Sequence, residues 1–189
     1  MEKYSNIRMV IFDFDGTIVR LNVNWGLLKR ELSTYFKRVY DFESDFASLY
    51  QEIDRINYLF GRKAREEALA VIEKYEFAGI DDLEFIPKAV KLIESLKDKR
   101  VKLAIFSSNT RKVVEAILRK IDKLGSFESI VTIEDISKNK PDPEGLRKIL
   151  RACKVSRSEA LFIGDRQRDL EAGKRAGIRT IYTREFLKA

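Results

Sequence analysis

The chain has 189 residues, of which 44% are hydrophobic and 35% are charged, a balance typical of a globular protein and not of a disordered one. Its apolar runs are too short to cross a bilayer, and its one cysteine, Cys153, excludes an internal disulfide framework, so we expect a cytoplasmic protein without a membrane partner. Histidine is absent, which excludes the Ser-His-Asp triad, the Cys-His pair and the usual histidine-ligated zinc site.

The net charge of +7 is spread unevenly, because residues 1–90 carry −3 and residues 91–189 carry +10. A basic half can attract nucleic acid, and it can equally concentrate a small phosphorylated anion at a site. A solvated, ion-paired surface is the simpler alternative.

Short apolar runs alternate with helical patterns along most of the chain. This alternation predicts crossover connections and an α/β fold, a parallel sheet with helices on both faces. Ligands of such sheets collect at the carboxyl ends of the strands. The expected strands are Met9–Asp13, Val101–Phe106, Ser129–Ile133, Ala160–Gly164 and Arg179–Tyr182, and the expected helices are 87–98, 110–124, 143–153 and 166–176.

About 65 residues between the first strand and the helix at 87 contain no convincing strand. Apolar residues recur there at helical spacing and predict three or four amphipathic helices. A crossover needs only about a dozen residues, so this stretch is expected to be an inserted helical module. It follows the carboxyl end of the first strand and is therefore placed to cover a site.

The first strand ends in two carboxylates, Asp13 and Asp15, followed by Gly16 and Thr17. Period two along an extended chain puts Asp13 and Asp15 on the same side. Neighbouring carboxylates repel, so they require a cation between them or a proton on one of them. Either outcome suits catalysis, and an acidic turn that only closes a strand is the alternative.

Three later strand ends also carry polar residues. Ser107 and Ser108 follow the second strand and offer hydroxyl and backbone N–H donors to an anion. Lys140 lies before a proline in the next connection and can project a positive charge. Asp165 and Asp169 follow the fourth strand, one helical turn apart, and such oxygen ligands suit Mg²⁺.

Together these residues resemble the four motifs of the haloacid dehalogenase-like hydrolase superfamily: Asp13–Thr17, Ser107, Lys140 and Gly164–Asp169. The resemblance implies a Rossmann-like core over residues 1–19 and 85–189. It also implies a helical cap over residues 20–84, as in phosphoglycolate phosphatase-like members of subfamily I.

The resemblance further implies a Mg²⁺-dependent phosphatase that acts on a small phosphorylated metabolite. Asp13 would be the nucleophile that carries the phosphoryl group, and Asp15 the acid and then the base. Asp13, the Asp15 carbonyl and Asp165 would bind Mg²⁺. Ser107 or Ser108, with Lys140, would hold the phosphoryl group, with Asp169, Gly16 and Thr17 in support. Counting the apolar residues of the strand favours Ser107 over Ser108.

The cap is expected to choose the substrate. Arg62 and Arg65 flank a break between two cap helices and are candidates for contacting an anionic leaving group, with an exposed basic loop as the alternative. Arg20, Asn22 and Asn24 are further lining candidates, whereas Trp25 is expected in the cap core. Arg166 and Arg168 depart from the small or neutral residues that the resemblance implies for the fourth motif, and we expect them on the solvent face, with a contact to an anionic substrate as the alternative.

Two other functions stay open. A phosphomutase uses the same two carboxylates, and a nucleic-acid-binding protein with a vestigial site would use the basic half of the chain. The second is not expected, because every catalytic position is filled and no recognition motif is present. The sequence does not distinguish a monomer from a homodimer.

Overall fold

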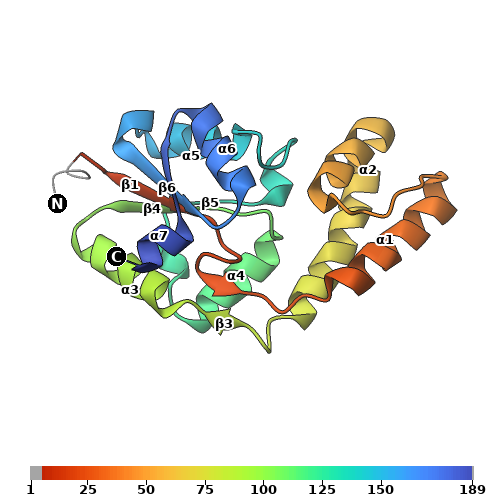
Figure 1. The fold of residues 1–189 in the computed structure, drawn as a ribbon, viewed down its shortest axis with the longest axis horizontal. Coiled ribbons are helices and arrows are strands. Elements are labelled where there is room, and N and C mark those ends of the chain that lie inside the picture. Colours follow the sequence, from red (N-terminus) through yellow and green to blue (C-terminus); the bar gives the residue numbers. More distant parts are fainter. Residues whose placement is uncertain (1–5, 189) are drawn as a thin grey trace.

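The computed structural model describes residues 6–188, and its centre is a five-stranded parallel sheet (Figure 1). The strands lie in the order β5-β4-β1-β6-β7, so the first strand is central and the chain turns outward on either side of it. This confirms the predicted Rossmann-like α/β class and puts the carboxyl end of β1 at the switch point, where ligands bind in such sheets. The strands are β1 (Met9–Phe12), β4 (Lys102–Phe106), β5 (Ser129–Val131), β6 (Ala160–Gly164) and β7 (Arg179–Tyr182).

Helices cover both faces of the sheet (Figure 1). Successive residues of β1 point to opposite faces, so Val10 and Phe12 pack in one hydrophobic cluster while Met9 and Ile11 pack in another. The first cluster includes α3 and α4, and the second includes α5 and α6. Burial on both faces explains why these strands are almost wholly apolar. The helices are α3 (Pro87–Asp98), α4 (Arg111–Lys120), α5 (Glu144–Cys153), α6 (Gln167–Ala176) and α7 (Thr183–Lys188).

The predicted inserted segment forms two long helices, α1 (Trp25–Tyr40) and α2 (Leu49–Ala78), which pack against each other beside the sheet (Figure 1). Gly61 interrupts α2 with φ 81° and ψ −174°, so α2 is two helical segments joined at a kink. The segment thus has three helical pieces, within the expected range. The phenylalanines Phe36, Phe42 and Phe46 are buried between the two helices.

Other elements were not expected from the sequence. A short antiparallel ribbon of β2 (Val19–Arg20) and β3 (Glu84–Phe85) joins the two chain connections between the sheet and the helical pair α1–α2. Three 3₁₀ turns, η2 (Leu124–Ser126), η3 (Ile133–Asp135) and η4 (Arg157–Glu159), lie in connections between core elements. Within residues 6–188, no helix is long and apolar enough to span a membrane.

Candidate active site

Asp13 directly follows β1 and lies at the carboxyl edge of the sheet. Its side chain is almost fully buried and accepts a hydrogen bond of 2.5 Å from the ammonium of Lys140. Lys140 also donates to Asp169 at 2.7 Å and to the carbonyl of Phe106 at 3.0 Å. Thr17 lies within 3.3 Å of the second Asp13 oxygen. One buried ammonium therefore holds two carboxylates from two different strand ends.

Asp15 lies two residues further on, and both aspartates line a cavity at this edge of the sheet. One of its oxygens accepts from the backbone N–H of Leu21 at 2.9 Å, which fixes the side chain against the chain that leaves the sheet. Gly16 has φ +87°, and a Cβ there would lie 2.2 Å from an oxygen of Asp165. Glycine is therefore required on two counts, the backbone conformation and the close approach of a carboxylate.

Asp13, Asp165 and Asp169 each place one carboxylate oxygen within 4.8 Å of the others, so they could hold a metal ion. The donor set fits Mg²⁺, because all the candidate ligands are oxygens and one of them, Asp13, lines a cavity that a phosphate could enter. Asp169 is already committed to Lys140 and to the N–H of Arg166, whereas Asp165 has only a distant ion pair of 3.6 Å with Arg166. Asp165 is therefore less engaged than Asp169 and freer to bind a cation beside Asp13.

The pKa values of these carboxylates reflect their burial and their closeness to one another. Burial raises the pKa of Asp13 to about 7, with Lys140 opposing and Asp169 and Asp165 adding to the rise. Burial, followed by the charge of Asp169, raises the pKa of Asp165, and burial raises that of Asp15. Burial also works against ionisation of Asp169, but its contacts with Lys140 outweigh burial and lower its pKa. A divalent cation among these carboxylates would relieve the repulsion that raises the pKa of Asp13 and Asp165.

The two serines after β4 have different surroundings. Ser107 is fully buried, donates to the side-chain oxygen of Asn109 at 2.9 Å and accepts from its backbone N–H at 3.0 Å. Ser108 lines the cavity, and its buried hydroxyl has no hydrogen-bond partner among the described residues. The apolar count pointed to Ser107, whereas in the structure Ser108 is the serine whose hydroxyl lies unpartnered beside the cavity.

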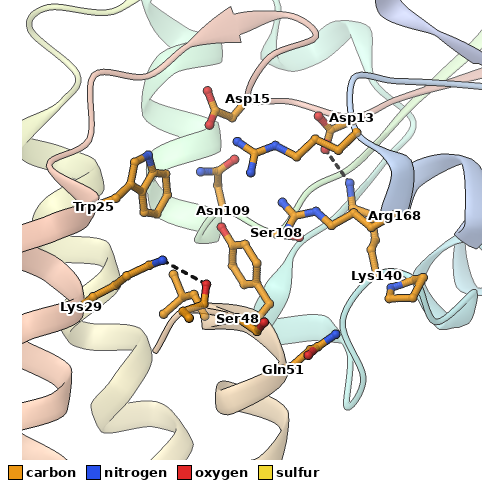
Figure 2. A pocket seen from close by; sticks show the side chains of 15 residues that line it. Asp13, Asp15, Trp25, Lys29, Ser48, Gln51, Ser108, Asn109, Lys140 and Arg168 are labelled. Carbon is orange, nitrogen blue, oxygen red and sulfur yellow. Dashed lines mark hydrogen bonds and ion pairs between the residues drawn. The ribbon is translucent and has the colours of Figure 1, made fainter. Parts of the chain in front are cut away.

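The cavity has a volume of about 450 Å³ and lies between the strand ends and the helical pair α1–α2. Figure 2 shows Asp13, Lys140 and Arg168 on one side and Trp25 and Lys29 on the other. Trp25 was expected in the interior of the helical module; it packs against the hydrophobic cluster there and also lines this cavity. Arg166 and Arg168 were expected on the solvent face, and both line it as well. The lining residues that sequence reasoning missed include Lys29, Ala47, Ser48, Tyr50 and Gln51.

Arg62 and Arg65 are not among the described residues that line the cavity, so the expectation of a substrate contact is corrected. Arg62 is exposed and pairs with Glu66 at 2.7 Å. Arg65 is buried and donates to the backbone carbonyls of Ile133 and Ile136, at 2.5 and 2.9 Å. The turn of α2 that follows the kink at Gly61 thus contacts the loop after β5 and not the cavity. The further lining candidates Arg20, Asn22 and Asn24 are not among the described residues that line the cavity either: Arg20 pairs with Glu84, and Asn24 caps α1.

Two further carboxylates of α2 contact loops of the site. Asp54 accepts from the backbone N–H and the side-chain amide of Asn139, at 2.8 and 2.6 Å, next to Lys140. Glu76 is fully buried and accepts from Asn109 at 2.7 Å and from the N–H and hydroxyl of Thr110 at 3.0 and 2.7 Å. Glu76 thus fixes Thr110, the N-cap residue of α4, while the first N–H of that helix, that of Arg111, donates to Glu134. No local sequence signal identified these pairs, since their members lie 85, 33 and 34 residues apart along the chain.

A sequence model of the family described as haloacid dehalogenase-like hydrolase matches residues 10–183. The chain belongs to this family. The match runs from β1 to the start of α7 and includes all four predicted motifs, so the resemblance drawn from the motifs is confirmed.

Relatives of this hydrolase are named as phosphatases. This chain is 30% identical over 182 residues to pyrophosphatase PpaX of Bacillus cereus, and the match covers 92% of this chain and 82% of the relative. A Lactobacillus plantarum structure proposed to be a phosphoglycolate phosphatase matches with a TM-score of 0.71 at 21% identity, over 96% of this chain and 88% of that chain. A variant of CbbY from Rhodobacter sphaeroides in complex with xylulose-(1,5)bisphosphate matches with a TM-score of 0.68 at 22% identity, over 93% of this chain and 85% of that chain. These structures support the fold.

Proposed function

We propose that this hydrolase is a Mg²⁺-dependent phosphatase that removes the phosphoryl group of a small phosphorylated compound through an intermediate on Asp13. The observation that carries the proposal is that Asp13, Asp15 and Lys140 line one cavity at the carboxyl edge of the sheet, with a carboxylate oxygen of Asp165 within 4.8 Å of one of Asp13. Asp13 and Asp15 are separated by one residue, so the same short segment offers a nucleophile and a separate proton donor. The names of the relatives, a pyrophosphatase among them, support the reaction class.

In the first step an oxygen of Asp13 forms a bond to phosphorus, and the bond from phosphorus to the leaving oxygen breaks. Asp15 gives its proton to that leaving oxygen, and its raised pKa favours the protonated form that this requires. In the second step Asp15 takes a proton from water, whose oxygen attacks the phosphorus and releases Asp13. Lys140 and the Ser108 hydroxyl hold the phosphoryl oxygens during both steps.

Asp13 and Asp165, together with the backbone carbonyl of Asp15, would hold the Mg²⁺. When bound, the cation would neutralise charge on the transferred phosphoryl group and on the carboxylates. Asp169 keeps Lys140 aligned on Asp13 through its 2.7 Å ion pair. The single buried cysteine, Cys153, agrees with a cytoplasmic enzyme.

The test follows phosphate release from an aryl phosphate, inorganic pyrophosphate and a panel of sugar phosphates. We expect turnover with Mg²⁺, none in excess chelator, and recovery when Mg²⁺ is restored. Asp13→Asn should lower turnover by at least about 1,000-fold, because an amide oxygen does not form an acyl phosphate. Undiminished activity in chelator would contradict the metal assignment, and isomerised product without free phosphate would indicate a phosphomutase.

A further inference from the structure

The cavity holds more positive charge than the transfer of one phosphoryl group uses. Lys140 is neutralised by Asp13 and Asp169, and Asp15 supplies the one other carboxylate among the described residues that line the cavity. Three more cations among the described residues line the same cavity, Lys29, Arg166 and Arg168. Such a concentration of cations favours a ligand with more negative charge than a single phosphoryl group carries.

The three extra cations differ in how far they are already paired. Lys29 donates to the carbonyl of Ala47 at 3.0 Å, and Arg166 lies 3.6 Å from the carboxylate of Asp165. Arg168 is half-buried, and its Nε atom is buried without a hydrogen-bond partner among residues 6–188. A buried N–H of a guanidinium that lacks an acceptor is costly, so a ligand oxygen at this place would be stabilising.

Contact with α2 fixes the orientation of Arg168. Its guanidinium carbon lies 4.5 Å from the centre of the Tyr50 ring, a stacking distance. Figure 2 shows the Arg168 side chain entering the cavity close to Ser108 and Asn109. Stacking covers one face of the guanidinium and leaves the N–H groups at its edge to donate in the plane of the group. Two such parallel N–H groups match the oxygens of a phosphate or a carboxylate.

We propose that Arg168, stacked on Tyr50, binds a second anionic oxygen group of the substrate, so that the preferred substrate is a phosphomonoester carrying another phosphate or a carboxylate. The inference rests on the proposed phosphatase function and specifies its substrate class. Arg168 lies in the loop and helix that follow β6, so the same segment supplies Asp165 near the reacting phosphate and Arg168 for the other anion. The separation between the two groups is thereby set within the sheet-bound part of the chain.

The test compares three substrates of one skeleton: 1,3-propanediol monophosphate, 1,3-propanediol bisphosphate and 3-phosphooxypropanoate. We expect the native enzyme to prefer one or both of the compounds that carry a second anionic group, and their ratio distinguishes phosphate from carboxylate. Arg168→Met should lower kcat/KM for the preferred compound by roughly 10- to 100-fold, and for the monophosphate by less than about threefold. Arg168→Lys should recover only part of the loss, because an ammonium lacks the planar fork.

Arg175→Met is the matched control, because Arg175 lies on the same helix, is exposed and pairs only weakly with Glu171 at 4.0 Å. It should leave all three values of kcat/KM as they are. Equal losses on the three substrates in Arg168→Met would overturn the proposal while leaving the phosphatase function in place.

Calorimetric binding to the Asp13→Asn variant makes the test independent of turnover. There 1,3-propanediol bisphosphate should bind more tightly than the monophosphate, and adding Arg168→Met should remove the difference. If no phosphate is released from any substrate but this binding difference is present, the second-anion site stands and the proposed phosphatase function fails. Equal binding of the two compounds to Asp13→Asn would overturn the site.

Discussion

Replacing Glu76 with glutamine should change how the stability of the hydrolase depends on pH. Burial raises the pKa of Glu76 from 4.5 to about 7, although hydrogen bonds from Thr110 and Asn109 oppose the rise and Glu134 adds to it. The folded state therefore holds the Glu76 proton more tightly than the unfolded state does. Its contribution to stability is fully present below pH 4.5 and is lost as pH rises through about 7.

The magnitude follows from the size of the shift. A difference of roughly 2.5 pKa units corresponds to about 3 kcal/mol of unfolding free energy. A glutamine has no proton to lose in this range. It keeps a carbonyl oxygen for Thr110 but turns its amide toward the amide of Asn109, so the variant is less stable than wild type at acid pH and approaches or exceeds it by pH 8.

Urea unfolding at pH 5, 6, 7 and 8 measures this difference between wild type and Glu76→Gln. Subtracting the two curves removes the titration of every other group. Glu73→Gln is the control: it removes a carboxylate one turn earlier on α2 that pairs with Lys112 at 2.9 Å near the surface, and should cost less than about 1 kcal/mol at each pH. If the stability difference between wild type and Glu76→Gln stays constant from pH 5 to pH 8, the reasoning is refuted.

Two further substitutions test packing around the site by urea unfolding. Arg65→Met should lower the free energy of unfolding by about 2–3 kcal/mol, because two buried carbonyls lose their donor. Arg62 is exposed, and Arg62→Met should lower it by less than about 0.5 kcal/mol. Equal losses in the two variants would contradict the structure. Gly145→Ala should cost about 1–3 kcal/mol and lower activity, since the new methyl would lie 2.1 Å from the ring of Phe106, whose carbonyl holds Lys140. Gly125→Ala, with open space around it, is the control, and a Gly145 variant as stable as wild type would show that the ring moves freely.

Much of the core could be predicted because its signals are local. The strand Ala160–Gly164 agrees with the prediction at both ends, and Gly177 ends α6 in the left-handed conformation expected of a helix C-cap. The strand-end residues could also be placed together, since parallel strands bring their carboxyl ends to one edge whatever the loops between them do. That is why Asp13, Lys140 and Asp169 were expected in one place and are found within hydrogen-bond distance.

The helical insertion was less predictable because its direction depends on contacts distant in sequence. Periodicity identifies the buried face of α2 but not the loop to which Arg65 extends, a distance of 68 residues along the chain. Trp25 has the apolar character of a core residue, and only the approach of α1 to the strand ends makes it a wall of the cavity. Arg168 satisfies a solvent-face pattern on α6, but Tyr50 of α2 covers that face.

Asp54, Arg65 and Glu76 all extend from one helix to loops that carry or adjoin the strand-end groups. The helical pair α1–α2 therefore does more than shield the cavity, because any rotation of α2 away from the sheet breaks these contacts together. Asn139 would be released beside Lys140, and Asn109 beside Ser107 and Ser108. The same helix, α2, therefore both lines the cavity and fixes the two loops that adjoin Lys140 and the serines after β4.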